Sequence, residues 1–342
     1  MAPGIDPNDV RLFSGSSHPQ LAQDIASYLG VPLDETHISR FSNDNLYIQL
    51  GASVRSRQVY ILQSLAPPVN DHLMELLMML DIARAASARE VHAIIPYFSF
   101  ARSDKKDAPR ISITARLVAD LLLTAGATHV MTMMLHSPQV HGFFSIPTDP
   151  LSSRPVFAHH FLQRDLTNTI VIAPDIGHAK SAARFASDLS LPVTAAIKER
   201  VSDSQVRIGG IVGQQVEGYR QALIYDDEIA TGGSILELSR LLIEEGVEQI
   251  LVACTHGVFV HGGMEKLAAV AQITEIVTTD TVHIPAEKRV SKLRVLSVGR
   301  IFGEAIRRNY AQQSIGDLFV FGEEDPESSP ATSAPTSGLS SR

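Results

Sequence analysis

The sequence predicts an α/β protein with two similar, mostly parallel sheets, and two observations lead to this fold class. Short runs of β-branched and aliphatic residues alternate with stretches of helical periodicity, and repeated strand–helix–strand order is typical of parallel sheets. The same order also occurs once in each half of the 342-residue chain. The runs expected to form strands are 59–65, 91–98, 128–136, 169–174, 222–227, 249–254 and 275–280.

Two segments carry apolar residues at the spacing of one helix face. The helix of the first half is expected over about 71–84, and that of the second half over 235–245 with Gly246 as its C-terminal cap. With their flanking strands these helices form a weak internal repeat. We therefore expect two domains, 9–152 and 153–321.

The composition restricts the possible functions. Hydrophobic residues make up 44% and charged residues 19%, as is usual for soluble globular proteins. The net charge of −8 and the lack of a strongly basic stretch argue against nucleic acid as a ligand. No apolar run has membrane-spanning length, and no signal peptide is expected. Cys254 is the only cysteine, so we expect no intrachain disulfide and a reduced, cytoplasmic setting. The Ser- and Pro-rich stretch 322–342 is expected to be a disordered tail.

The stretch LIYDDEIATGGS, residues 223–234, predicts a ligand-binding loop. A hydrophobic strand ends in the adjacent carboxylates Asp226 and Asp227, and a glycine turn then leads directly into a helix. Backbone N–H groups at 231–234 would bind an anion such as phosphate. Because two carboxylates would repel a phosphate, they are expected to bind ribose hydroxyls or a divalent metal. A sugar phosphate satisfies both ends of the loop.

The same stretch also has a simpler interpretation as an ordinary turn. Ser234 and Glu237 have the spacing of a capping box, in which the serine hydroxyl would only cap the helix. Gly232 and Gly233 permit positive φ and would suit many solvated turns. The adjacent acids after a hydrophobic strand favour the ligand-binding interpretation.

Further segments narrow the prediction from a loop to a family. Together with this loop they resemble, in order, the ribose-phosphate pyrophosphokinases over about residues 10–320. The segments are FSGSSHPQLAQDIASYLG near the start, RFSNDN (40–45), NDHLMELLMMLDIARAASA (70–88), PYFSFARSDKKD (96–107), MMLHSPQVHGFFSIPTD (133–149), PDIGHAK (174–180) and IKER (197–200).

The resemblance implies a fold and a reaction. Both domains are expected to have the type I phosphoribosyltransferase fold. The reaction is transfer of the diphosphoryl group of ATP to the 1-hydroxyl of ribose 5-phosphate, which gives phosphoribosyl pyrophosphate and AMP (EC 2.7.6.1). The family needs Mg²⁺, assembles from dimers and often reaches hexamers. It is regulated by phosphate or nucleotide, and Arg55, Arg110 and Ser314 lie in segments that resemble its regulatory region.

The resemblance also implies an ATP site made from three segments. An aromatic ring in RFSNDN can stack on a purine, while its amides can hydrogen-bond the base, and in the family a neighbouring subunit helps to build this site. The charged loop ARSDKKD suits a triphosphate with its metal, although spacing alone would also fit a solvated loop. The residues assigned to ATP are Phe41, Asn43, Asn45, Arg102, Ser103, Asp104, Lys105 and His136.

The remaining assignments concern the metal, catalysis and the sugar. By resemblance, His136 and Asp175 bind Mg²⁺, and Lys198 and Arg200 act on the transferring phosphoryl groups. Cations suit that role because negative charge spreads over the phosphoryl oxygens in the transition state. The residues expected to bind ribose 5-phosphate are Arg200, Asp226, Asp227, Ala230, Thr231, Gly232, Gly233 and Ser234.

Several positions depart from the usual family pattern. Met134 and Ser145 replace carboxylates, Asn45 stands where glutamate is frequent, and Ser103 stands where glutamine is frequent. Ala230 stands where an aspartate is common. Because Met134 precedes His136 by two residues in the expected strand 128–136, alternation predicts that Met134 faces the metal region.

Two alternatives to this enzyme remain. A phosphoribosyltransferase would use the same loop on a preformed donor, but it would not need the ATP segments. A non-catalytic regulatory subunit is supported by Met134, Ser145 and Asn45, whereas retention of Lys198 and Arg200 argues against it.

Overall fold

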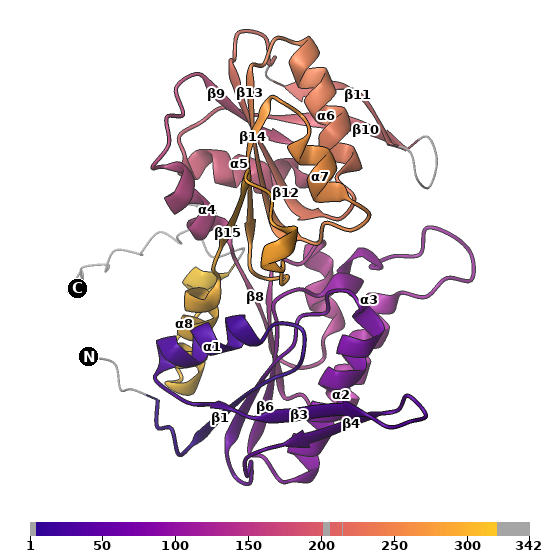
Figure 1. Cartoon of the computed structure of the whole chain (residues 1–342), viewed down its shortest axis with the longest axis vertical. Helices are drawn as coiled ribbons and strands as arrows, with labels where there is room; N and C mark the ends of the chain where they lie inside the picture. Colours follow the sequence, from indigo (N-terminus) through magenta and orange to yellow (C-terminus); the bar gives the residue numbers. More distant parts are fainter. Residues whose placement is uncertain (1–4, 201–205, 214, 320–342) are drawn as a thin grey trace, which may run out of the picture.

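The computed structural model describes residues 5–200, 206–213 and 215–319 and contains two large sheets, one in each half of the chain (Figure 1). The first sheet has the order β2-β1-β5-β6-β7-β8, and all of its neighbouring strands are parallel. Its strands are β1 (Val10–Ser14), β2 (Leu33–Asp34), β5 (Gln58–Leu62), β6 (Glu90–Ile95), β7 (His129–Met133) and β8 (Thr148–Leu151).

The second sheet has the order β11-β10-β9-β12-β13-β14-β15 and is parallel except where β11 pairs with β10. Its central strands are almost wholly buried, as expected for a parallel sheet covered by helices. The strands are β9 (Thr169–Ala173), β10 (Val193–Arg200), β11 (Val206–Gly213), β12 (Gln221–Ile229), β13 (Gln249–Gly257), β14 (Ile273–Thr279) and β15 (Leu293–Leu296).

Helices connect the strands in both halves, and a small hairpin accompanies the first sheet. The hairpin consists of β3 (Thr36–Arg40) and β4 (Leu46–Leu50), which pair antiparallel. The helices are α1 (Pro19–Leu29), α2 (Val69–Ala85), α3 (Thr114–Ala125), α4 (Arg154–Phe161), α5 (Ala179–Asp188), α6 (Gly233–Glu244), α7 (Gly263–Ala268) and α8 (Gly299–Tyr310). Short 3₁₀ helices are η1 (Ser99–Arg102), η2 (Pro138–Phe143), η3 (Ile176–His178), η4 (Ala286–Lys288) and η5 (Gly316–Leu318).

The last helix belongs to the second half in sequence but to the first half in space. Helix α8 lies beside α1 in the lower part of Figure 1, and its residues Phe302 and Ile306 share a hydrophobic cluster with Leu21 and Ile25. Gly303 allows the two helices to approach closely, because a Cβ there would lie 2.4 Å from the Tyr28 ring. The chain therefore crosses between the two cores once more after β15.

Most of the predicted elements are present, with some changes at their ends. Gly246 follows α6 with a φ of 92°, as expected for a glycine at a helix C-terminus. The expected strand 128–136 ends at Met133, so that the next three residues lie beyond it. The prediction of a capping box is wrong. The residue that precedes α6 is Gly232, with a φ of 78°, and Ser234 lies inside the helix. The expected tail 322–342 lies outside the described residues, and the division into 9–152 and 153–321 stays a prediction.

Candidate active site

The carboxyl ends of the two sheets meet at His136 and Asp227. His136 follows β7 of the first sheet, and Asp227 lies near the end of β12 in the second. The Nδ1 atom of His136 is 2.5 Å from Oδ2 of Asp227, which is a short hydrogen bond to a buried carboxylate. Ligand sites of open α/β sheets occur at the carboxyl ends of the strands. This contact joins a residue predicted for ATP with one predicted for the sugar.

His178 is a second imidazole beside the acidic pair. Its Nε2 atom is 3.3 Å from Oδ1 of Asp227, and its Nδ1 atom is 3.9 Å from Oδ1 of Asp226. Asp175 orients this histidine, because its Oδ1 atom accepts the backbone N–H of His178 at 3.1 Å at the start of η3. The loop after β9 therefore places an imidazole directly against the end of β12.

The two adjacent carboxylates have pKa values shifted in opposite directions. Burial, followed by the neighbouring Asp227 charge, raises the pKa of Asp226 well above its usual value. Burial also acts to raise the pKa of Asp227, but the His136 hydrogen bond and the charge of His178 outweigh it and lower that pKa. The same hydrogen bond raises the pKa of His136. The site therefore concentrates negative charge on Asp227. Asp226 takes up a proton, or accepts a hydrogen bond from a hydroxyl, more readily than an ordinary aspartate beside a second charge.

Arg102 connects the first sheet to the same strand of the second. Its guanidinium is 3.2 Å from Oε1 of Glu228, whose side chain is buried, while the Arg102 side chain is 52% exposed. Burial, more than any other effect, raises the pKa of Glu228. Arg102 thus lies at the solvent side of the acidic pair, where an anionic ligand can reach it.

The glycine turn after β12 leads from the acids into α6. Gly232 has a φ of 78°, and Gly233 is the first residue of the helix. The first turn of a helix leaves N–H groups without intrahelical acceptors, so the predicted anion-binding geometry is present here. A Cβ on Gly232 would lie 3.2 Å from Leu267, and one on Gly263 of α7 would lie 2.9 Å from the Ala230 carbonyl oxygen. Packing against α7 therefore requires small residues on both sides.

The other residues predicted for ATP do not join this cluster in the structure. Phe41, Asn43 and Asn45 form the turn between β3 and β4, where the Phe41 ring is 58% exposed and contacts Tyr47. The hydroxyl of Ser103 lies at the start of α3, where it accepts the backbone N–H of Thr114 and donates to the Thr114 hydroxyl. Asp104 and Lys105 follow it in the loop that leads to α3.

Some of the predicted residues cannot be placed. The backbones of Lys198 and Arg200 pair with β11, opposite Ile208 and Val206. Their side chains lie outside the described residues, so their catalytic role stays a prediction.

Three site residues were not singled out from the sequence: His178, Glu228 and Tyr97. His178 lies in the segment PDIGHAK, directly after a buried strand. A polar side chain at such a strand end is the sequence feature that could have identified it as a site residue. Glu228 directly follows the acidic pair, and burial, followed by the charge of Glu228, raises the pKa of the neighbouring Tyr97. Contacts between the two halves, which sequence spacing does not reveal, bring these residues together.

The prediction for Met134 is wrong. Because β7 ends at Met133 and Met134 has a φ of 39°, strand alternation does not continue to His136. The Met134 side chain is buried in the hydrophobic cluster that contains Met131 and Met133. It therefore does not face the metal region.

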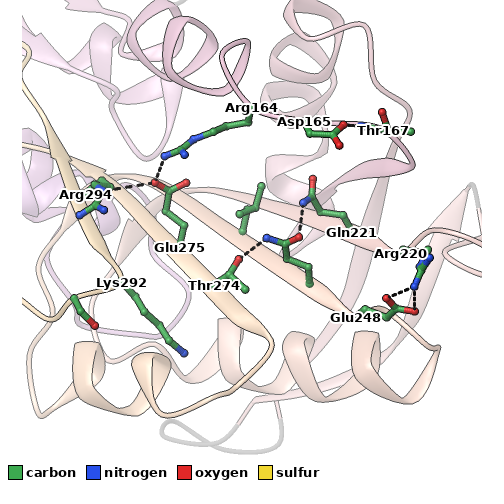
Figure 2. A pocket seen from close by; sticks show the side chains of 13 residues that line it. Arg164, Asp165, Thr167, Arg220, Gln221, Glu248, Thr274, Glu275, Lys292 and Arg294 are labelled. Carbon is green, nitrogen blue, oxygen red and sulfur yellow. Dashed lines mark hydrogen bonds and ion pairs between the residues drawn. The ribbon is translucent and has the colours of Figure 1, made fainter.

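A separate pocket of about 540 Å³ lies at the opposite, amino edge of the second sheet (Figure 2). Its floor is a row of hydrogen bonds from Gln221 to Gln249 and on to Thr274. Its cations are largely occupied by acids of the same pocket, because Arg220 pairs with Glu248 and both Arg164 and Arg294 approach Glu275. This pocket is remote from the acidic pair at the other end of the strands.

The acidic pair also fits a divalent cation. Within the described residues, one ligand atom from each of His178, Asp226 and Asp227 lies within 4.8 Å of the others. Two carboxylates suit Mg²⁺, which prefers oxygen ligands. The predicted pair His136 and Asp175 does not form this group, although both residues bond to its members.

Comparisons with known proteins identify the family of the chain. The family model for the N-terminal domain of ribose phosphate pyrophosphokinase matches residues 10–126. The model for the phosphoribosyl synthetase-associated domain matches residues 207–320. Together the two models cover most of the chain.

Individual relatives match over nearly their whole length. A protein from Streptomyces coelicolor is 49% identical over 311 residues, covering 91% of this chain and 98% of the relative. The ribose-phosphate pyrophosphokinase of Deinococcus radiodurans is 44% identical over 314 residues, covering 90% and 97%. The crystal structure of phosphoribosylpyrophosphate synthetase from Mycobacterium smegmatis has a TM-score of 0.83 at 34% identity, covering 89% of this chain and 99% of that chain.

Two mostly parallel sheets, with an acidic pair that leads into a glycine turn, define an α/β protein with the type I phosphoribosyltransferase fold. More narrowly, the chain belongs to the ribose-phosphate pyrophosphokinase family. The predicted fold class, family and enzyme class are thereby confirmed. No helix in the described part of the chain has the length and apolar character needed to cross a membrane.

Proposed function

We propose that this chain, as a ribose-phosphate pyrophosphokinase, makes phosphoribosyl pyrophosphate at the junction of His136 and Asp227. The observation that carries this proposal is their 2.5 Å contact, which joins an ATP segment of the first half to the sugar loop of the second. A phosphoribosyltransferase would not need that connection, because it uses a preformed donor.

The sugar phosphate binds along the loop after β12 in this proposal. The ribose hydroxyls donate hydrogen bonds to Asp226 and Asp227, and the 5-phosphate accepts from the turn formed by Ala230, Thr231, Gly232, Gly233 and Ser234. The high pKa of Asp226 supports this placement, since a hydroxyl donor would relieve the repulsion between the two carboxylates.

The nucleotide binds on the first-half side of the junction. The contacts of Arg102 with Glu228 and of His136 with Asp227 support a role for both residues on this side. Ser103, Asp104 and Lys105 contribute from the adjoining loop. The turn that contains Phe41, Asn43 and Asn45 supplies the adenine contacts of a neighbouring subunit, because its exposed aromatic ring can stack on a base. This requires a homo-oligomer, for which we propose a dimer-based assembly up to a hexamer.

The transfer is a displacement at the β-phosphorus of ATP. The 1-hydroxyl oxygen of ribose 5-phosphate forms a bond to that phosphorus, and the bond from it to the oxygen on the α-phosphorus breaks. AMP leaves with that oxygen, and the hydroxyl proton is released. Lys198 and Arg200 stabilise the charge on the phosphoryl oxygens, Lys198 as a point charge and Arg200 as a fork that also reaches the sugar phosphate.

The cofactor is Mg²⁺, which when bound neutralises phosphate charge and orients the reacting groups. Asp226, Asp227 and His178 are the residues that fit it directly, with His136 and Asp175 holding them in place. We also propose a cytoplasmic location and the domain division 9–152 and 153–321, followed by the tail 322–342.

The test is a product analysis of the purified protein with ATP, ribose 5-phosphate and Mg²⁺. AMP and phosphoribosyl pyrophosphate are expected in equal amounts. ADP as the nucleotide product would indicate transfer of a single phosphoryl group and would contradict the proposal. A complete lack of turnover would favour the non-catalytic subunit instead.

A further inference from the structure

Met134 is fixed at three points just before His136. Its side chain is buried in the core of the first half, and its N–H donates to the Leu151 carbonyl at 3.0 Å. Its φ of 39° is unusual for a residue other than glycine, and such a backbone persists only where its surroundings hold it. The third point is its carbonyl oxygen, which lies 3.1 Å from Nε2 of His256.

His256 comes from the other sheet. It lies on β13, directly opposite Glu228 of the neighbouring strand β12. Its ring is buried and lies 4.8 Å from the ring of Tyr97 in the first half. One side chain of the second sheet therefore hydrogen-bonds the backbone of the segment that carries His136.

The hydrogen bonds around His256 define its protonation. A carbonyl oxygen only accepts, so Nε2 must carry the proton that it donates to Met134. Nδ1 is then the acceptor that faces the hydroxyl of Thr281 at 2.9 Å, and this hydroxyl also lies 3.0 Å from the Thr255 carbonyl oxygen. Burial lowers the pKa of His256 to about 4, so the ring is neutral near pH 7. A neutral donor holds the carbonyl without adding a positive charge beside the acidic pair.

The consequence concerns the placement of His136. A left-handed residue two positions earlier sets the direction in which the chain leaves β7, and the rest of the turn follows from it. Because β7 ends at Met133, the regular geometry of the strand does not direct His136 toward Asp227. The Met134–His256 bond spans both halves two residues before His136 and fixes the backbone that carries it.

We propose that His256 is a positioning residue: by donating to the Met134 carbonyl across the two sheets, it holds His136 against Asp227. The proposal rests on the proposed function, in that the positioned histidine belongs to the ATP side of the active site. His256 itself is buried and touches neither substrate.

Two amide substitutions separate the two nitrogen atoms of the ring. The amide nitrogen of glutamine reaches about as far as Nε2, whereas that of asparagine reaches only as far as Nδ1. His256→Gln therefore keeps the donor to Met134, and His256→Asn loses it. We expect kcat to fall at least about tenfold in His256→Asn and to stay within about threefold in His256→Gln. The KM for ribose 5-phosphate should change less than kcat in both, since the glycine turn that binds the 5-phosphate in the proposed function does not contact this bond.

The matched control is His92, a buried histidine on β6 whose pKa is also lowered by burial. His92→Asn should lower the melting temperature in a similar way and leave kcat unchanged. Equal kcat values for the two His256 variants, or an equal loss in His92→Asn, would overturn the positioning role. If His256→Asn does not fold, His256→Met replaces it, because methionine is of similar length and has no hydrogen-bond donor. Its control is His92→Met, at the other buried histidine.

A crystal structure of His256→Asn, or of His256→Met, separates this proposal from the proposed function. We expect the His136 ring to move away from Asp227 there, while it keeps its place in His256→Gln. An unmoved His136 in the first variant would refute the positioning role whatever the enzyme assay shows. Conversely, a wild-type protein that makes no AMP would refute the proposed function and leave this structural comparison valid.

Discussion

The two halves of the molecule repeat one strand–helix–strand unit but end their strands with different chemistry. In the second half, β12 ends in Asp226 and Asp227, and a glycine turn leads into α6. In the first half, β5 is followed by the buried Gln63 and Ser64, and Pro68 precedes α2. The end of β5 therefore lacks the adjacent acids and the glycine turn that follow β12, and the acid in the first turn of α2 is the single residue Asp71.

The proposed function divides the site between the two sheets. In that proposal the second sheet provides the sugar loop, and the first sheet provides Arg102 and His136, which contact the end of β12. Near the end of β5, the buried Glu75 of α2 instead accepts hydrogen bonds from Ser16 and Gln63. The end of β5 is thus bonded within its own half, whereas the segments after β6 and β7 contact the second half.

The largest effect is expected at β10 of the second sheet. Lys198→Ala should lower kcat about a hundredfold or more with little change in the KM for ribose 5-phosphate, because the lysine acts mainly on the transition state. Steady-state kinetics with both substrates measure this split. Lys288→Ala, at η4 in the same half, is the control and should behave like the wild type. A large rise in KM with intact kcat would make Lys198 a ground-state binding residue.

The acidic pair should show the next largest effect. Asp226→Asn and Asp227→Asn should each weaken ribose 5-phosphate binding by about tenfold or more, because an amide is a poorer acceptor for hydroxyls and metal than a carboxylate. ATP binding should change less. Calorimetry with each substrate tests this, with Asp120→Asn on the exposed side of α3 as the control. An equal loss of affinity for ATP and for ribose 5-phosphate would show that the acidic pair is not specific to the sugar, and the second half would then not be a separate sugar site.

At Met134 the sequence predicts a side chain that faces the metal region, whereas the structure buries it in the core of the first half. Because Met134 is buried among apolar side chains, Met134→Asp should lower the free energy of unfolding by about 3 kcal/mol through an unpaired buried carboxylate. The Mg²⁺ concentration for half-maximal activity should stay the same. Met134→Leu conserves the volume and should cost less than about 1.5 kcal/mol.

Melting curves and a magnesium titration on the same three proteins decide this question. A lower Mg²⁺ concentration for half-maximal activity in Met134→Asp would instead support the prediction from strand alternation that residue 134 faces the metal region. The outcome matters beyond this position, because it tells whether the carboxylates that are usual in the family are replaced here by packing.

The sequence predicted the fold class because strand and helix periodicities are local. It also predicted the acidic pair and the glycine turn, since all of them lie within one strand–turn–helix unit. What it could not predict depends on contacts between distant segments. His178 and Glu228 become site residues only when β9 and β12 lie side by side and the first half covers them.

Strand ends were the other source of error. The period of a strand continues in a sequence pattern even where the backbone leaves the sheet, as happens at Met134 with its left-handed φ. The packing of α8 on α1 is likewise invisible to local patterns, because the two helices are separated by most of the chain. In each case a tertiary contact, rather than local propensity, determines the result.

The smallest predicted effect concerns this crossing of α8 into the first half. Glu304 accepts from Tyr28 of α1 at 2.8 Å and pairs with Arg307 and Arg308 of its own helix. The Arg307 hydrogen bond is the main reason that the pKa of Glu304 is lowered. Glu304→Gln should therefore lower the free energy of unfolding by about 1 kcal/mol at neutral pH.

The sign of the pH dependence follows from the lowered pKa. The contribution of Glu304 is fully present above the unfolded-state pKa, at about pH 4.3, and is lost as the pH falls toward the folded-state pKa. Urea unfolding at pH 7 and at about pH 3 should thus show a clear difference between wild type and Glu304→Gln that shrinks in acid. Glu237→Gln, which breaks an exposed pair with Arg240 on α6, should change the free energy by less than about 0.5 kcal/mol. If the two glutamine variants were equally stable at pH 7, the Tyr28–Glu304 contact would add nothing to the attachment of α8, and apolar packing alone would hold the last helix on the first half.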